Sequence, residues 1–171
     1  MLYTIGHSNR SLSEFVAMLK AHGVEQLVDV RTAAGSRRNP QFMKDELDRA
    51  LAAEAIQYTH LKGLGGFRKL APDSVNMGWR NASFRGFADY MQTDDFRSAL
   101  DDLLELAAER PTAIMCAEAV PWRCHRSLIA DAISARGFPV SHIMSPARAN
   151  PHTLTAFARV EDGRVTYPAE T

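Results

Sequence analysis

Cysteine is scarce in this chain, with only two among 171 residues, at positions 116 and 124. Two cysteines cannot form the disulfide framework of a small secreted domain, and their spacing is not that of a zinc ribbon. Long hydrophobic runs are also missing, since no segment reaches the roughly 18 apolar residues that a membrane helix needs. The chain does not open on a basic stretch followed by an apolar run. We therefore expect a cytoplasmic protein with no membrane partner.

Net charge is absent as well, because 20 basic residues balance 20 acidic ones. The whole molecule therefore has no field that would by itself attract nucleic acid, and any charge argument must be local. Apolar residues at 46% and charged residues at 23% are ordinary values, which argues against a disordered or collagen-like chain. The length suits one domain over residues 1–171, whose tail, residues 146–171, changes character after Ser145.

Short apolar runs alternate with stretches of helical periodicity. The runs lie at residues 2–5, 26–30, 56–61, 112–116 and 139–143. Helices are predicted behind Ser11 with Glu14 as a capping box, behind Asn39 and Pro40 through residue 51, over 96–107, and from 128 to a stop at Gly137. Residues 160–165 suggest a hairpin, whereas residues 62–82 are either a functional loop or an unrecognised element. The fold class is therefore α/β, with a mostly parallel sheet of about five strands flanked by helices.

The loops after parallel strands gather at one edge of the sheet, where ligands bind. The basic residues of these loops and the adjoining helix starts are Arg10, Arg31, Arg37, Arg38, Lys62, Arg68, Lys69, Arg80, Arg85, Arg123 and Arg126. Only Asp73 and Glu118 oppose them, whereas residues 94–109 are mostly acidic. This polarity predicts a cationic mouth for an anion such as phosphate, although arginines also favour loops for reasons unrelated to ligands.

Aromatic residues directly precede arginine at five places, more often than chance spacing gives. The pairs are Phe67–Arg68, Trp79–Arg80, Phe84–Arg85, Phe96–Arg97 and Trp122–Arg123. A stacking ring beside a phosphate contact suits nucleotides or single strands. Packing of the rings in the core is an equal alternative.

Chemistry-bearing residues are densest between residues 116 and 126. A strand ending at Cys116 leads through Glu118 to a helix start at Cys124, His125 and Arg126. A cysteine near a helix N-terminus with His and Arg neighbours can have a lowered pKa and act as a nucleophile. Either cysteine fits that role, with Glu118 and His125 as proton carriers. The alternatives are a buried structural cysteine and an ion pair of Glu118 with a neighbouring arginine.

Other segments are expected at the same edge. Arg126 is a candidate anion clamp, joined by His7 and Ser8 after the first strand and by Arg31 and Arg37 after the second. Gly65 would permit a close backbone approach, while Arg31 could instead form a framework ion pair with Asp29.

A metal is the weaker interpretation of the thiols. Cys116, Cys124, His125 and His7 could supply zinc ligands, but their spacing gives little support. The loop after Cys116 also fails the cysteine-phosphatase signature by one position, so no such chemistry is assigned.

Several motifs together resemble a known family. They are Thr4-Ile5-Gly6-His7-Ser8, Asp29-Val30-Arg31, Pro40 with Phe42, Leu64-Gly65-Gly66, and Cys116-Ala117-Glu118 with Cys124-His125-Arg126. The chain is similar over nearly its whole length to the bacterial and archaeal family called domain of unknown function 488. The resemblance implies a small α/β domain with a polar site in these motifs, and no established reaction. Ala33-Ala34-Gly35 departs from relatives that carry proline near Ser36.

We therefore expect an enzyme, a hydrolase or transferase, that binds a phosphate-bearing small molecule or nucleic acid through these residues. One alternative is a non-catalytic nucleic-acid-binding module, in which the thiols only pack. The other is a metal or redox sensor, for which bound zinc or a reactive thiol would count.

Overall fold

The computed structural model describes residues 1–169, so the last two residues of the predicted tail lie outside it. The strands are β1 (Leu2–Gly6), β2 (Gln26–Asp29), β3 (Gln57–His60), β4 (Thr112–Cys116), β5 (Val140–Ser145), β6 (Arg148–Pro151), β7 (Arg159–Glu161) and β8 (Arg164–Thr166). The α-helices are α1 (Leu12–Ala21), α2 (Lys44–Ala52), α3 (Ala82–Tyr90), α4 (Asp94–Glu109) and α5 (Arg126–Ala135). Three short 3₁₀ turns lie at Pro40–Phe42, Lys62–Leu64 and Pro121–Arg123.

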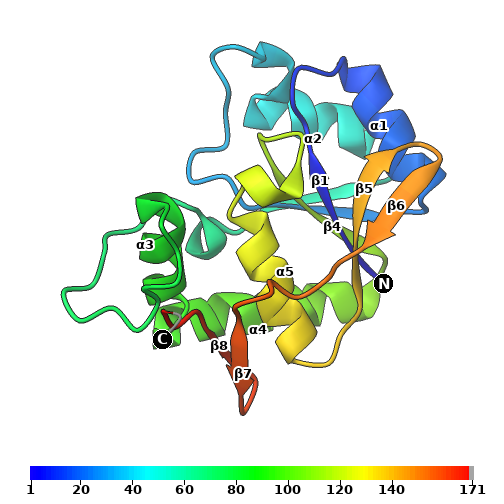
Figure 1. The fold of residues 1–171 in the computed structure, drawn as a ribbon. Coiled ribbons are helices and arrows are strands. Elements are labelled where there is room, and N and C mark those ends of the chain that lie inside the picture. Colours follow the sequence, from blue (N-terminus) through cyan, green and yellow to red (C-terminus); the bar gives the residue numbers. More distant parts are fainter. Residues whose placement is uncertain (170–171) are drawn as a thin grey trace.

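Six strands form one sheet in the order β3-β2-β4-β1-β5-β6 (Figure 1). All neighbours are parallel except β5 and β6, which are antiparallel. The strands β7 and β8 form a separate hairpin next to α5. This arrangement confirms the predicted α/β class, the mostly parallel sheet and the C-terminal hairpin.

The sheet separates two apolar layers, because successive strand residues face opposite sides. Leu27 and Met115 face α1 and α2, whereas Val28 and Ile114 face α3, α4 and α5. The two helix groups lie on opposite sides of the sheet in Figure 1. The continuous burial of β2 and β4 is what a central parallel strand covered on both faces requires.

Local signals set several element ends. The Ser11 hydroxyl accepts from the Glu14 backbone N–H at 3.1 Å, which confirms the predicted N-cap of α1. Gly137 has φ +87 just after α5, as a helix stop requires. Asp162 and Gly163 both have positive φ at the tip of the hairpin, in keeping with a tight turn between β7 and β8.

The predicted helix behind Asn39 is wrong in its start. The Asn39 side chain makes no cap, and an extended Met43 separates the 3₁₀ turn from α2. The Phe42 carbonyl accepts from Arg31 Nη1 at 2.8 Å instead of from the next helical turn. A tertiary contact therefore overrides the local helix signal.

Two elements lie outside the predictions, α3 and β6. The segment before α3 is ordered by the Asp89 carboxylate, which accepts from the Ala71 N–H, the Ser74 hydroxyl and the Asn76 amide. The long stretch at residues 62–82 is thus a 3₁₀ turn followed by a structured loop.

The chain order places the point where the connections change sides of the sheet between β1 and β4. The helix after β1 packs on one face of the sheet and the helix after β4 packs on the other, so the connections diverge between these neighbouring strands. No helix of the described residues is long and apolar enough to cross a membrane.

Candidate functional site

A cleft of about 400 Å³ opens at the carboxyl ends of β2 and β4, and we call it the thiol cleft. Its lining includes Arg31, Thr32, Gly35, Gly66, Phe67, Ser83, Phe84, Cys116, Glu118, Arg123, Cys124 and His125. The segments after two parallel strands, the start of α3 and the turn before α5 thus meet here, as parallel-sheet topology requires.

Cys116 and Arg126 form the floor of this site. Arg126 is fully buried, and its Nη1 donates to Cys116 Sγ at 3.0 Å and to the Glu118 carbonyl at 2.6 Å. Its Nη2 donates to the Ala119 carbonyl at 3.1 Å. Burial alone raises the pKa of Cys116, but the hydrogen bond from the Cys124 thiol and the Arg126 charge outweigh it and lower that pKa to about 7. A large share of Cys116 is therefore thiolate at neutral pH.

Cys124 behaves in the opposite way. Burial, the hydrogen bond that its thiol makes to Cys116 and the negative charge there raise its pKa well above the ordinary value. The Arg126 backbone N–H donates to Cys124 Sγ at 3.4 Å. The two thiols thus divide into a thiolate at Cys116 and a protonated donor at Cys124.

His125 is the residue before α5, and its ring contacts Cys124. Its Nε2 lies 3.0 Å from the Val30 carbonyl and 2.9 Å from the Leu64 carbonyl, so Nε2 carries the proton. Burial lowers the pKa of His125 to about 4. The bare Nδ1 then faces Cys124 Sγ at 3.5 Å, while the Cys124 thiol donates its one proton to Cys116. The neutral His125 ring thus packs against Cys124, and its Nε2 proton is held by the two carbonyls.

His7 and Arg31 lie together but are sealed in pairwise contacts. Arg31 binds both oxygens of the buried Asp29, with the closest approach 2.7 Å, which is the framework ion pair weighed above. His7 stacks on Phe42, donates from Nδ1 to the Ser8 carbonyl at 2.8 Å and faces Arg31 Nη1 at 3.5 Å. Burial lowers the pKa of His7, so its ring is neutral. Arg31 reaches the cleft, whereas His7 lies outside its lining.

The other predicted residues are placed unevenly. Glu118 is exposed in the cleft, and its carboxylate makes no ion pair within residues 1–169, so the alternative pairing with an arginine is not seen. Ser8 has positive φ and hydrogen-bonds Asn9, while Arg37 is exposed in the loop after β2. Gly65 is buried, and a Cβ there would lie 3.0 Å from Thr32. These three residues lie outside the cleft lining.

Several arginines of the predicted cationic mouth are held by contacts inside the protein. Besides Arg31 and Arg126, Arg68 donates to the carbonyls of Gly65, Lys62 and Gly63 and lies over Tyr90. Arg85 donates to the Trp79 carbonyl. Arg123 lines the cleft and is exposed. Arg37, Arg38 and Lys69 are exposed as well and follow the lining residues Gly35 and Phe67 closely in the sequence. The charge available to a ligand is thus smaller than the sequence count.

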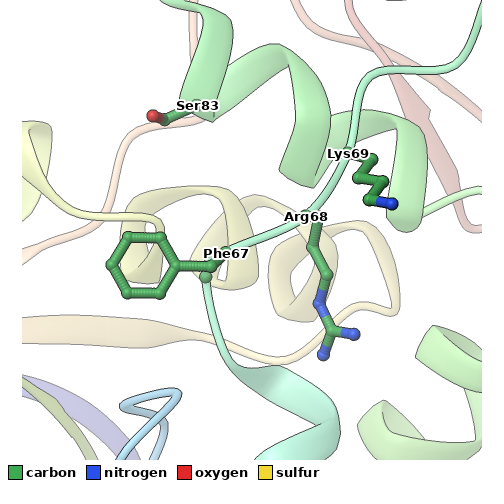
Figure 2. Close-up of a pocket in the computed structure, with 5 residues that line it drawn as sticks. Phe67, Arg68, Lys69 and Ser83 are labelled. Atoms are coloured by element: carbon green, nitrogen blue, oxygen red, sulfur yellow. The ribbon is translucent and has the colours of Figure 1, made fainter.

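Phe67 is the exposed aromatic at this edge, with 85% of its surface accessible. It lines both the thiol cleft and a smaller neighbouring pocket that includes Arg68, Lys69 and Ser83. In Figure 2 the Phe67 ring points away from the Arg68 and Lys69 side chains. Trp79 and Phe84, by contrast, pack edge to face, so packing explains that part of the aromatic pattern.

Sequence reasoning did not include Gly6 among the site residues. A Cβ at Gly6 would lie 1.7 Å from the Glu118 carbonyl oxygen and 2.6 Å from Arg126 Nη1. Only glycine therefore allows β1 to pass beneath the Arg126 contact. The signal for it is a glycine at the end of a buried strand.

The described part of the chain holds no group of three or more His, Cys, Asp or Glu side chains arranged to bind a metal. The four zinc candidates separate into a pair of thiols with His125 and a His7 whose ring is enclosed by Phe42 and Arg31. The cysteines are both free.

No curated protein and no solved structure matches the chain. A family profile described as "Domain of unknown function DUF488" matches residues 11–133, which is more than half of the chain and includes Cys116, Glu118, Cys124, His125 and Arg126. The chain therefore belongs to the DUF488 family.

Proposed function

We propose that this protein is a cysteine-dependent enzyme, a hydrolase or transferase, that acts on a phosphate-bearing ligand in the thiol cleft. The observation that carries the proposal is the 3.0 Å contact between Arg126 Nη1 and Cys116 Sγ at the floor of an open cleft. A guanidinium dedicated to a thiol stabilises the thiolate, which is the nucleophilic form of cysteine. Free thiols also suit the reducing cytoplasm, the compartment we propose.

Each neighbouring group has a role in covalent catalysis. Cys116 Sγ bonds to the electrophilic atom of the ligand while the leaving group departs. Glu118 is the exposed carboxylate of the cleft. In the second step it takes a proton from the water or acceptor molecule, which attacks the adduct and frees the Cys116 thiolate. His125 acts as a positioning residue, because both its nitrogens are engaged.

The phosphate-bearing ligand is a nucleotide or nucleic acid. Arg123 lines the cleft, and its exposed guanidinium supplies the nearest charge. The N-terminus of α5 adds partial positive charge on the same side, since the helix begins at Arg126.

The thiolate assignment predicts the pH profile of alkylation. Iodoacetamide should modify Cys116 with a midpoint near pH 7, because Arg126 and Cys124 favour the thiolate. Cys124→Ser should keep a single reactive thiol, and Cys116→Ser should lose the fast reaction near neutral pH. Peptide mass spectrometry locates the label. A fast reaction at Cys124 in the Cys116→Ser variant would contradict the assignment.

The function itself is tested with oligonucleotides and nucleotides as substrates. A covalent adduct or a turned-over product should form with wild-type protein and disappear with Cys116→Ser, measured by intact mass and by chromatography of the ligand. Glu118→Gln should accumulate the adduct, because release needs the base. Turnover that survives Cys116→Ser would overturn the proposal.

Binding gives a separate prediction. Arg123→Gln should weaken binding of a fluorescein-labelled single strand and reduce the salt dependence of the affinity by about 0.7 in log–log slope, the value for one lost phosphate contact. Arg97→Gln removes a charge from the exposed face of α4. It is the matched control and should leave binding unchanged. Equal losses in both variants would indicate non-specific attraction.

A non-catalytic single-strand binder is the second candidate, favoured by the exposed Phe67 ring beside Lys69. In that case Phe67→Ala weakens binding of the single strand, and Cys116→Ser leaves the affinity for it unchanged.

A further inference from the structure

A second cleft of about 400 Å³ lies beyond the turn that carries the thiol-site residues, and we call it the tryptophan cleft. Both tryptophans of the chain, Trp79 and Trp122, line it. Trp122 is exposed over 66% of its surface, although it is one of the most apolar side chains available for burial. Its neighbour Arg123 lines the thiol cleft, so the two clefts share one connecting segment.

A buried relay of hydrogen bonds reaches the wall of the tryptophan cleft. His152 Nε2 donates to the fully buried Asp131 carboxylate at 2.7 Å, and His142 Nε2 donates to His152 Nδ1 at 2.7 Å. The Thr4 hydroxyl donates to His142 Nδ1 at 2.5 Å. Asp131 also accepts from the Tyr167 and Thr155 hydroxyls, each at 2.7 Å.

This relay decides what the cleft can bind. Each ring nitrogen of His142 and His152 has a partner inside the protein, so neither ring demands a ligand hydrogen bond or a metal. Both imidazoles are almost wholly buried, so the exposed aromatic surface of the cleft is mainly that of Trp122. Hydrogen-bonding groups remain at Ser127, Asn150 and Thr153, which also line it.

We propose that the tryptophan cleft binds a nucleobase. Indole rings suit a flat heteroaromatic ring, and the Asn150 amide offers both a donor and an acceptor to its edge. The volume lies in the range of small-molecule sites. Arg123, the residue after Trp122, lies where the phosphate of the same nucleotide would pass toward the thiol cleft. The inference takes its ligand class from the proposed function but does not require the thiol chemistry.

Intrinsic fluorescence tests this directly, because every tryptophan of the protein lines this cleft. Adenosine and thymidine, which carry no phosphate, should quench the emission excited at the red edge of the tryptophan band and should bind by calorimetry. Ribose 5-phosphate, which carries no base, should do neither. Trp122→Ala should weaken nucleoside binding at least about five-fold, the lower limit for loss of one stacked base.

Phe138→Ala is the matched control, because it also removes an exposed aromatic ring but lines neither cleft. It should leave nucleoside affinity unchanged. The inference is overturned if no nucleoside binds up to millimolar concentration, or if Phe138→Ala weakens binding as much as Trp122→Ala. Repeating the titration with Cys116→Ser separates the two ideas: nucleoside binding that persists there stands whether or not the thiol is catalytic, and oligonucleotide turnover without nucleoside binding leaves the proposed function intact.

Discussion

Replacing Arg126 by methionine is expected to destabilise the fold by about 3 to 5 kcal/mol, the usual cost of removing one partner from a buried charged contact. The guanidinium is fully buried, and the Cys116 thiolate and the carbonyls of Glu118 and Ala119 would all lose their donor. Chemical denaturation at pH 8 measures the loss. Arg136→Met is the control, because Arg136 makes only a partly exposed ion pair with Asp101 and should cost far less.

The same substitution should change the chemistry of Cys116. Without Arg126, the thiolate loses the charge and the hydrogen bond of the guanidinium and keeps only its contacts with Cys124 and the Glu118 backbone, so the pKa of Cys116 should rise above about 7. Arg126→Lys keeps a positive charge and should give an intermediate alkylation midpoint, so the effect is readable even if the methionine variant folds poorly. A midpoint that remains near 7 in the lysine and methionine variants would show that Arg126 does not set the thiolate.

The fold was predictable where local pattern and tertiary environment agree. The five parallel-sheet strands are short apolar runs, and α1, α4 and α5 keep a buried stripe at helical spacing. The strand β6 has no such pattern, because Arg148–Pro151 is extended only through pairing with β5. In α3 the buried face includes Gly86 and Asp89, which do not mark a helix face in sequence.

The candidate site was predictable in position but not in detail. Topology alone brings Cys116, Glu118 and Arg31 to one edge, because each follows a neighbouring parallel strand. The direction of a long side chain depends on which acceptors lie nearby in three dimensions, and Arg126 points to Cys116 and backbone carbonyls rather than outward. A charge count over loops could not separate such enclosed arginines from free ones.

Lowering the pH from 7 to 5 is expected to destabilise the protein by several kcal/mol through buried histidines. Burial lowers the pKa of His125 and of His142 to about 4, and it lowers the pKa of His7 as well. In the unfolded chain these rings titrate near pH 6.5, so the unfolded state binds protons that the folded state refuses. Each ring with a pKa of about 4 should contribute on the order of 2 kcal/mol at pH 5. Stability should therefore fall as pH drops below about 7.

Urea denaturation at pH 7, 6 and 5 measures this dependence, and a single variant identifies its source. His142→Gln removes a titrating ring, so its stability should be lower at pH 7 but should change by about 2 kcal/mol less between pH 7 and pH 5. Cys116 contributes little to the change between pH 7 and pH 5. Its pKa is lowered to about 7, so its ionisation adds stability as the pH rises from 7 toward the pKa of an unfolded thiol. A wild-type free energy of unfolding that is flat across the window would mean that the buried rings accept protons, which their burial argues against.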